Sequence, residues 1–299
     1  MRNIMKPATT LRRLVLWVLF LIVPVAVQAQ TQLGSAAALR AKFDAVHTQI
    51  DKNIFGRPLV LESTEASGQL SGDIFAVLNH PFDQVSASLS QPGVWCDVLM
   101  LHLNTKYCAP RGTDDARSLA VSVGRKFDQP LSEATRVDFV WQPPKIGDDY
   151  LSVRLSADKG PLSTRDYRIE LEATPLGNGK TFMHLGYAYA YGVAARIAMQ
   201  GYLSTIGSDK VGFTVTGKNP AGEPTYVGGV RGVVERNTMR YYLAIDSFLE
   251  YPTAPELDKR LASWFDATEQ YAKQLHETER ADYLTMKRNE YRRMKDGGN

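Results

Sequence analysis

Residues 72–82 read Gly-Asp-Ile-Phe-Ala-Val-Leu-Asn-His-Pro-Phe and contain a complete change of secondary structure. The apolar run from Ile74 to Leu78 is continuous and rich in β-branched and aromatic side chains, which favours a buried strand. Pro81 suits the first position of a helix, because its φ is already helical and the N–H that it lacks would be unpaired there. The stretch therefore predicts a buried strand that leads into a short helix over 82–89.

Downstream of this stretch the apolar period changes from that of a helix to that of a strand. Apolar residues alternate with small or polar ones in a series of short segments, 119–123, 137–141, 151–157 and 167–173. Such alternation is typical of strands with one buried face. Turn residues over 175–179 connect the series to a further strand, 181–191. We expect an antiparallel meander.

Helical periodicity marks both ends of the chain. Apolar residues spaced by three or four predict one helix over 35–53 and another over 236–251. The charged segment 256–295 is expected to form one long helix. Its apolar stripe weakens after Leu275, so we expect its second half to leave the body of the domain. The remaining expected elements are a helix over 194–205 and strands over 211–216 and 226–234.

The order of these elements, together with residues 72–82, resembles the opening of START-like proteins, a superfamily that includes polyketide cyclases and lipid-transfer proteins. Val85, Leu89 and Trp95 continue the resemblance, and Thr-Arg-Asp-Tyr over 164–167 is similar to the start of a START-domain strand. The resemblance implies an α+β helix-grip fold over 60–251, in which a curved antiparallel sheet surrounds a helix and encloses an apolar cavity. Residues 30–59 would add an N-terminal helical segment, and 252–299 a long charged C-terminal helix.

Residues 1–29 have the pattern of a secretory signal peptide. Basic residues precede an apolar run over 14–27, and Val27, Gln28 and Ala29 supply the small residues that signal peptidase requires. The run is shorter than the roughly 20 residues that a helix needs to cross a bilayer. We expect cleavage after Ala29 and a periplasmic or secreted mature protein without a transmembrane segment; a retained anchor is the alternative.

Removal of this segment changes the charge balance. The full chain has 35 Lys and Arg against 32 Asp and Glu, and four of the basic residues precede Ala29. Subtracting those four leaves 31 basic against 32 acidic residues, so the mature chain is about neutral. Nucleic-acid binding depends on a basic surface. We therefore expect no nucleic-acid partner.

Cys96 and Cys108 are the only cysteines in the chain. In an oxidising compartment two such residues are expected to form a disulfide. Closing so short a loop would contribute about 3 kcal/mol to stability. A pair of buried thiols is the alternative, and without histidines at ligand spacing the pair is a poor zinc site.

The sequence contains no local signature of catalysis. The motifs Gly-x-Ser-x-Gly and His-Glu-x-x-His and a glycine-rich phosphate loop are absent, and the five histidines stand singly. We therefore expect no catalytic residue, metal site or cofactor. The absence of these motifs favours a function other than catalysis.

Candidate ligand-binding residues lie on the strand 181–191. Tyr187, Tyr189 and Tyr191 share one face, and they combine apolar area with hydroxyls that need partners when buried. This suits an amphipathic ligand, although core packing is the alternative. Trp141 lies on the apolar face of its own strand and is a further candidate.

A polar candidate lies near the start of the expected helix 236–251. Glu235 and Arg240 would form a cluster at the end of the cavity that orients a ligand carboxylate or hydroxyl. The alternative is a structural ion pair, with Asn237 as the cap of the helix.

Three functions remain open on these grounds. The first is a periplasmic protein that binds or carries a hydrophobic or lipid-like small molecule in a helix-grip cavity. The second is an envelope interaction module that has a filled core and binds a protein partner through the C-terminal helix. The third is a cyclase-like or hydrolase-like enzyme, which requires a titratable pair in the cavity.

Overall fold

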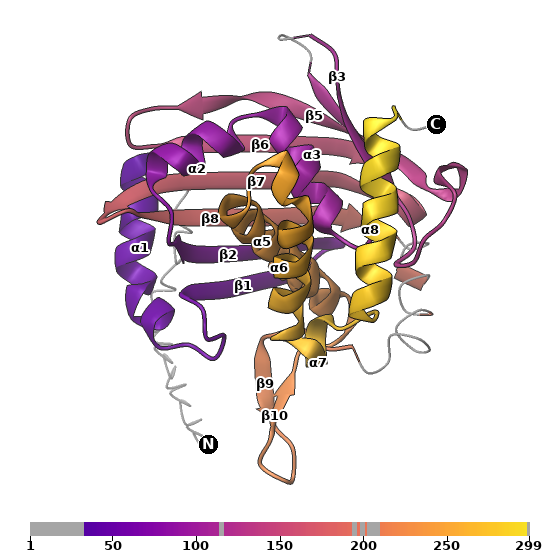
Figure 1. Ribbon diagram of the computed structural model, residues 1–299. Helices are drawn as coiled ribbons and strands as arrows, with labels where there is room; N and C mark the ends of the chain where they lie inside the picture. Colours follow the sequence, from indigo (N-terminus) through magenta and orange to yellow (C-terminus); the bar gives the residue numbers. More distant parts are fainter. Residues whose placement is uncertain (1–32, 114–116, 193–195, 198–200, 202–209, 298–299) are drawn as a thin grey trace, which may run out of the picture. The chain divides into compact units, whose positions relative to one another are not determined.

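The computed structural model describes residues 33–113, 117–192, 196–197, 201 and 210–297 (Figure 1). The expected signal peptide and most of the expected helix over 194–205 lie outside the described residues. Among the helices that are described, none is long and apolar enough to cross a membrane.

An eight-stranded antiparallel sheet is the main element of the described chain, with the strand order β1-β2-β8-β7-β6-β5-β4-β3 (Figure 1). From β3 to β8 neighbouring strands follow one another in sequence, so the expected meander is confirmed. The strands are β1 (Leu59–Ala66), β2 (Gln69–Leu78), β3 (Thr105–Arg111), β4 (Ser118–Val123), β5 (Thr135–Ile146), β6 (Leu151–Lys159), β7 (Thr164–Gly177) and β8 (Lys180–Tyr191).

The stretch 72–82 folds as expected. β2 ends at Leu78, and α2 (Phe82–Leu89) begins directly after Pro81. The strand is buried on both faces: Ile74 packs in the main core, and Phe75 packs beneath α1 (Ala36–Asp51) on the opposite face. A continuous apolar run is therefore required here, and an alternating one would leave one of the two faces unpacked.

The long helix α5 (Gly229–Glu250) packs against β1, β2 and β8. Two helices between β2 and β3, α2 and the unexpected α3 (Pro92–Leu101), pack against α5 from the side. An antiparallel meander that holds a long helix after its last strand is the helix-grip arrangement. The expected α+β helix-grip fold is confirmed.

The expected strand over 226–234 is wrong. Residues from Gly229 onward are helical, because Val230 and Val234 are one helical turn apart and both are buried in the core. Gly232 permits close contact with the loop before β9, since a Cβ there would lie 3.1 Å from the backbone nitrogen of Gly212. The short strands are instead β9 (Val215–Lys218) and β10 (Pro224–Tyr226), which form a separate hairpin (Figure 1).

The C-terminal region is helical, as expected, but it is not one continuous helix over 256–295. It consists of α6 (Leu257–Glu269), α7 (Ala272–Leu275) and α8 (Arg280–Lys295). The expectation that its second half leaves the domain is wrong, because α8 packs against α3, α6 and β3. The buried face of α8 carries charged as well as apolar residues: Tyr283, Met286, Lys287, Glu290 and Tyr291.

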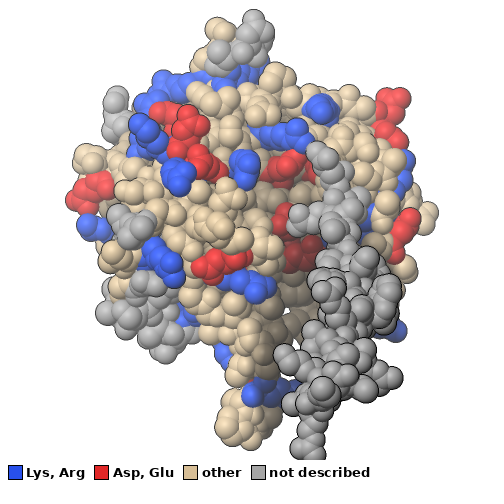
Figure 2. Space-filling view, turned by 180° about the vertical axis from the view of Figure 1, so that it is seen from behind, with Lys and Arg blue, Asp and Glu red and all other residues tan. Residues whose placement is uncertain are grey.

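Charges of both signs are mixed on the face turned away from the viewer in Figure 1. Figure 2 shows that Lys and Arg side chains there lie beside Asp and Glu side chains, without a large area of one sign. Ion pairs of the described residues, such as Arg154 with Glu170 and Lys42 with Glu62, bring opposite charges together in this way. The described part of this face that is visible in Figure 2 shows no extended basic area of the kind that binds nucleic acid.

Candidate functional site

A cavity of about 150 Å³ lies between the sheet and α5. Strands β4, β5 and β7 and the helix α3 supply its apolar wall, which consists of Leu99, Val121, Val123, Val137, Phe139 and Ile169. The cavity is thus placed where a helix-grip fold would hold a ligand. Neither Asp nor Glu contributes to the described wall.

Polar side chains gather on the side of the cavity formed by α5, β8 and the end of α3. We call His102, Asn237, Tyr187 and Tyr241 the polar corner; all four line the cavity. Tyr241 stacks on His102 with 5.0 Å between ring centroids, and it contacts Tyr187 edge-on at 5.2 Å. Asn237 and Tyr241 are one turn apart on α5, so they share a helix face.

His102 is almost completely buried at the C-terminal end of α3. Its Nδ1 accepts a hydrogen bond from the backbone N–H of Asn104 at 3.1 Å. Burial, together with the positive charges of Arg240 and Lys287, holds the pKa of His102 well below its usual value, and Asn237 opposes this only in part. The imidazole is therefore neutral at physiological pH.

Tyrosine rings continue from the polar corner along the inner face of the sheet. Tyr167 stacks on Tyr189 with 5.3 Å between ring centroids, and Tyr187 lies against both of these rings. Burial raises the pKa of Tyr187, Tyr189 and Tyr241 above the ordinary value. All three keep their hydroxyl protons and are available as donors.

The structure separates the candidates proposed from the strand pattern. Tyr187 lines the cavity, whereas Tyr189 packs behind it against Tyr167. The hydroxyl of Tyr191 donates to Glu65 at 2.8 Å, at the far edge of the sheet. Trp141 is buried against Trp95, with 6.4 Å between ring centroids, and does not line the cavity.

The expected cluster of Glu235 and Arg240 at the cavity is not formed. The Glu235 carboxylate is fully buried and accepts hydrogen bonds from the backbone N–H of Phe213 and of Thr214. These bonds hold the loop before β9 against α5. Arg240 donates to Glu277 at 2.9 Å. Asn237 lies inside α5 rather than at its cap, because the helix begins eight residues earlier, at Gly229.

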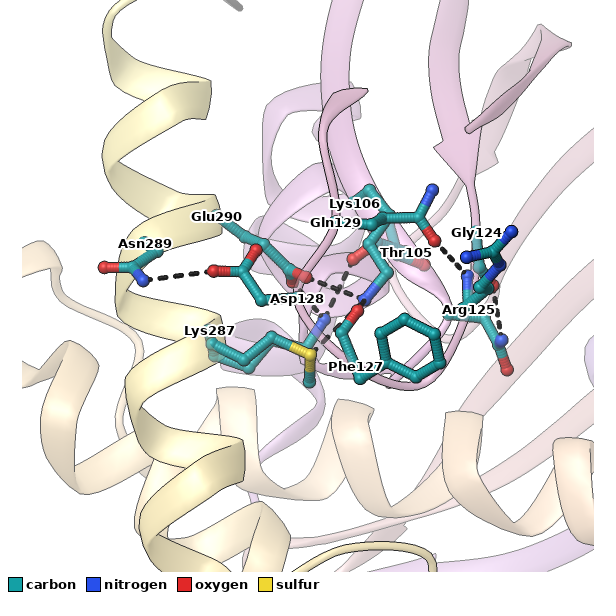
Figure 3. A network of polar contacts seen from close by, with 12 residues as sticks. Thr105, Lys106, Gly124, Arg125, Phe127, Asp128, Gln129, Lys287, Asn289 and Glu290 are labelled. Carbon is teal, nitrogen blue, oxygen red and sulfur yellow. Dashed lines mark hydrogen bonds and ion pairs between the residues drawn. The ribbon is translucent and has the colours of Figure 1, made fainter. Parts of the chain in front are cut away.

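A buried ionic network supports the wall of the cavity from α8 (Figure 3). Glu290 accepts hydrogen bonds from Lys106 at 2.8 Å and from Lys287 at 2.7 Å, and all three side chains are fully buried. Lys287 also donates to the carbonyl oxygens of His102 and Thr105, two residues that line the cavity. Burial lowers the pKa of Lys287 to about 8, although Glu290 opposes the shift.

The disulfide between Cys96 and Cys108 is confirmed, with a Cα–Cα distance of 5.2 Å. It ties α3 to β3, and both residues lie in the main core. The bond therefore fixes the relative position of two elements that carry cavity residues. Among the described residues, no group of His, Cys, Asp and Glu side chains could hold a metal ion.

Three members of the polar corner were not found from the sequence. His102 is far from Asn237 and Tyr241 in the chain, and no motif connects the three residues. The spacing of Asn237 and Tyr241 was the one available signal, because residues four apart on an amphipathic helix share a face. This spacing was not recognised, because a helix that starts at residue 236 makes Asn237 a capping residue. The helix in fact starts at Gly229, so Asn237 lies within it.

No protein-family model and no curated protein sequence matches this chain. Among solved structures it is similar to human StAR-related lipid transfer protein 5, at 12% identity and a TM-score of 0.31 over 56% of this chain and 89% of that one. It is also similar to human STARD10, at 9% identity and a TM-score of 0.33 over 59% and 78% of the two chains.

A bacterial structure shows the same kind of similarity. A StAR-related lipid transfer protein from Xanthomonas axonopodis aligns at 15% identity and a TM-score of 0.29, over 49% of this chain and 91% of that one. The evidence for the fold is the strand order of the sheet and the position of α5 within it. By these features the chain has the helix-grip fold and resembles START-like proteins.

Proposed function

We propose that this protein binds a hydrophobic or amphipathic small molecule in the cavity between the sheet and α5. One observation carries the proposal: the cavity has an apolar wall of aliphatic and aromatic side chains and a small set of convergent polar groups. Binding sites for small molecules have this composition, because apolar walls supply affinity and a few polar groups fix orientation.

The size of the cavity limits what can enter it. Its 150 Å³ matches the scale of engineered protein cavities that bind benzene, about 150 Å³. Pockets for drug-sized ligands have volumes of about 300 to 1,000 Å³. The ligand is therefore a small molecule, or a larger one of which a ring-sized part enters.

We place this binding activity in the periplasm or outside the cell. The pattern of residues 1–29 supports export, and a disulfide between Cys96 and Cys108 suits an oxidising compartment. The protein would act there as a binder or carrier of its ligand. The proposed location rests on the sequence of residues 1–29 and does not depend on the cavity.

The structure favours binding over the two other functions. A general acid–base enzyme needs a titratable pair at its site, and the described cavity wall has one histidine without a carboxylate. An interaction module was expected to use a free C-terminal helix and a filled core. The apolar residues of α8 are instead buried, and the core contains a cavity.

A cavity-filling variant tests the proposal. Val121 lines the cavity, so Val121→Phe is expected to occupy part of it. Val140 is on the outer surface of the neighbouring strand and is 54% exposed, which makes Val140→Phe the matched control. Native mass spectrometry of protein from a bacterial envelope should show a small bound mass in the wild type and in Val140→Phe, and less or none in Val121→Phe.

The same preparation can contradict the proposal. Toluene and benzoate are added to stripped wild-type protein, and uptake is followed by ligand-observed NMR. Wild-type protein that carries no bound mass and takes up neither probe would exclude a functional cavity.

A further inference from the structure

The polar corner contains a buried donor that makes no hydrogen bond of normal geometry with the described residues. Because Nδ1 of His102 accepts from the backbone N–H of Asn104, the proton of the neutral ring is on Nε2. This Nε2 is buried, and the side chain of Asn237 is close enough to interact with the ring, but no hydrogen bond of normal geometry joins Nε2 to a described residue. Buried polar groups are hydrogen-bonded in the great majority of cases, so a buried donor without a well-formed bond beside a cavity is suited to an acceptor that a ligand brings.

Two further donors lie next to His102. The hydroxyls of Tyr187 and Tyr241 make no hydrogen bond with the described part of the chain, whereas that of Tyr191 on the same strand is bonded to Glu65. The rings of His102, Tyr241 and Tyr187 follow one another at 5.0 and 5.2 Å between centroids. Three side chains that can donate a hydrogen bond thus lie next to one another on one side of the cavity.

Positive charges act on this side of the cavity. Arg240, Lys287 and Lys126 each lower the pKa of His102 through their charge. The potential at the ring is therefore positive, and this stabilises an anionic acceptor more than a neutral one.

The rest of the cavity wall determines the size and shape of the apolar part of the ligand. The rings of Phe139, Tyr167, Tyr187 and Tyr241 surround a space of about 150 Å³. Aromatic walls pack well against a flat ring, and the volume matches one ring. A long acyl chain would exceed the space.

We infer that the cavity takes a small monocarboxylic acid with an aromatic or compact aliphatic body, whose carboxylate accepts hydrogen bonds from the polar corner. This inference rests on the proposed function and adds the chemical class of the ligand. The carboxylate occupies the side formed by His102, Tyr187 and Tyr241, and the apolar body lies against β4, β5 and β7.

Benzoate and toluene test this inference, because they share the ring and differ in the carboxylate. With the full mature chain at pH 7, calorimetric titration should show benzoate binding at least about tenfold more tightly than toluene, as expected for hydrogen bonds to a charged acceptor. Tyr187→Phe and Tyr241→Phe should each weaken benzoate about tenfold and leave toluene unchanged. Tyr189→Phe is the matched control, since it removes a hydroxyl from the same strand face outside the cavity.

The outcomes separate the two claims. If toluene binds as tightly as benzoate and the two variants have no effect, the carboxylate assignment is overturned and the apolar cavity stands. If neither compound binds the wild type, both the assignment and the proposed function fail. The wild-type comparison is decisive even if one of the variants does not fold.

Discussion

His184 lies between two carboxylates on the face of the sheet opposite the cavity. Its Nε2 is 2.9 Å from Asp73 and its Nδ1 is 3.3 Å from Glu172, which also accepts from Tyr150. Burial disfavours the charged ring, but the hydrogen bonds to Asp73 and Glu172 raise the pKa of His184 to about 9. The imidazolium is therefore the native form at neutral pH.

This shift predicts a pH-dependent contribution to stability. The folded pKa of about 9 is higher than the unfolded value of about 6.5, so the stabilisation is fully present below pH 6.5 and is lost as the pH rises through 9. Its size is on the order of 3 kcal/mol. Urea unfolding should show a larger difference between wild type and His184→Asn at pH 6 than at pH 9.5. An equal difference at both values would contradict a charged His184.

Elements differ in how far the sequence could predict them. The strand 181–191 was predictable because one face is apolar throughout, and β8 has these bounds within one residue. The packing of α8 could not be predicted, because its buried face includes Lys287 and Glu290. A polarity pattern assigns such charged residues to the exposed face. The pairing of Lys287 with Glu290 and the bonds of Lys287 to backbone carbonyls make this burial possible. Lys106, which also pairs with Glu290, and the carbonyl groups come from a distant part of the chain.

The cavity could not be predicted for the same reason. Seven helices and strands line it, namely α3, β3, β4, β5, β7, β8 and α5, together with the segments before β3 and before β7, and no single segment contains enough of these residues to reveal the site. Among the candidate ligand-binding residues Tyr187 lines the cavity, and it lies on the strand with the clearest apolar face.

Removal of α8 is expected to destabilise the protein. The hydroxyl of Tyr283 donates to the carbonyl of Leu101, and Lys287 to that of His102, so α8 provides partners for the C-terminal carbonyls of α3. A chain ending at Glu279 would lose both of these bonds and would leave Lys106 buried without Glu290, at a cost of about 3 to 5 kcal/mol. Chemical denaturation should show at least this loss, whereas a chain ending at Asp296 should match the wild type. Equal stability of the two truncated chains would mean that α8 is not packed.

The disulfide has a separate expected effect at the junction of α3 and β3. Cys96→Ser should lower the free energy of unfolding by about 2 to 5 kcal/mol, because it removes the constraint between Cys96 and Cys108. Thiol titration of unreduced, denatured wild-type protein should detect no reactive thiol. Two reactive thiols per chain would show that the bond does not form in the cell.

At the scale of the whole molecule, we expect residues 1–29 to direct the protein out of the cytoplasm and their removal to change its charge. The full chain has a sequence isoelectric point of about 8.7. Loss of 29 residues removes four basic groups and no acidic one, so the mature protein should focus close to neutrality. This agrees with the mixed charges of the surface in Figure 2.

Export can be tested with the complete chain in a bacterial host. The periplasmic fraction should contain protein that begins at Gln30, identified by its intact mass and by its lower isoelectric point. Ala29→Arg is the control, because signal peptidase requires a small residue at this position, and this variant should keep its N-terminal segment and remain with the membrane. Wild-type protein that keeps residues 1–29 and sediments with the membrane would mean that the segment is an anchor. The binding domain would then act from the membrane surface, and a soluble carrier would be excluded.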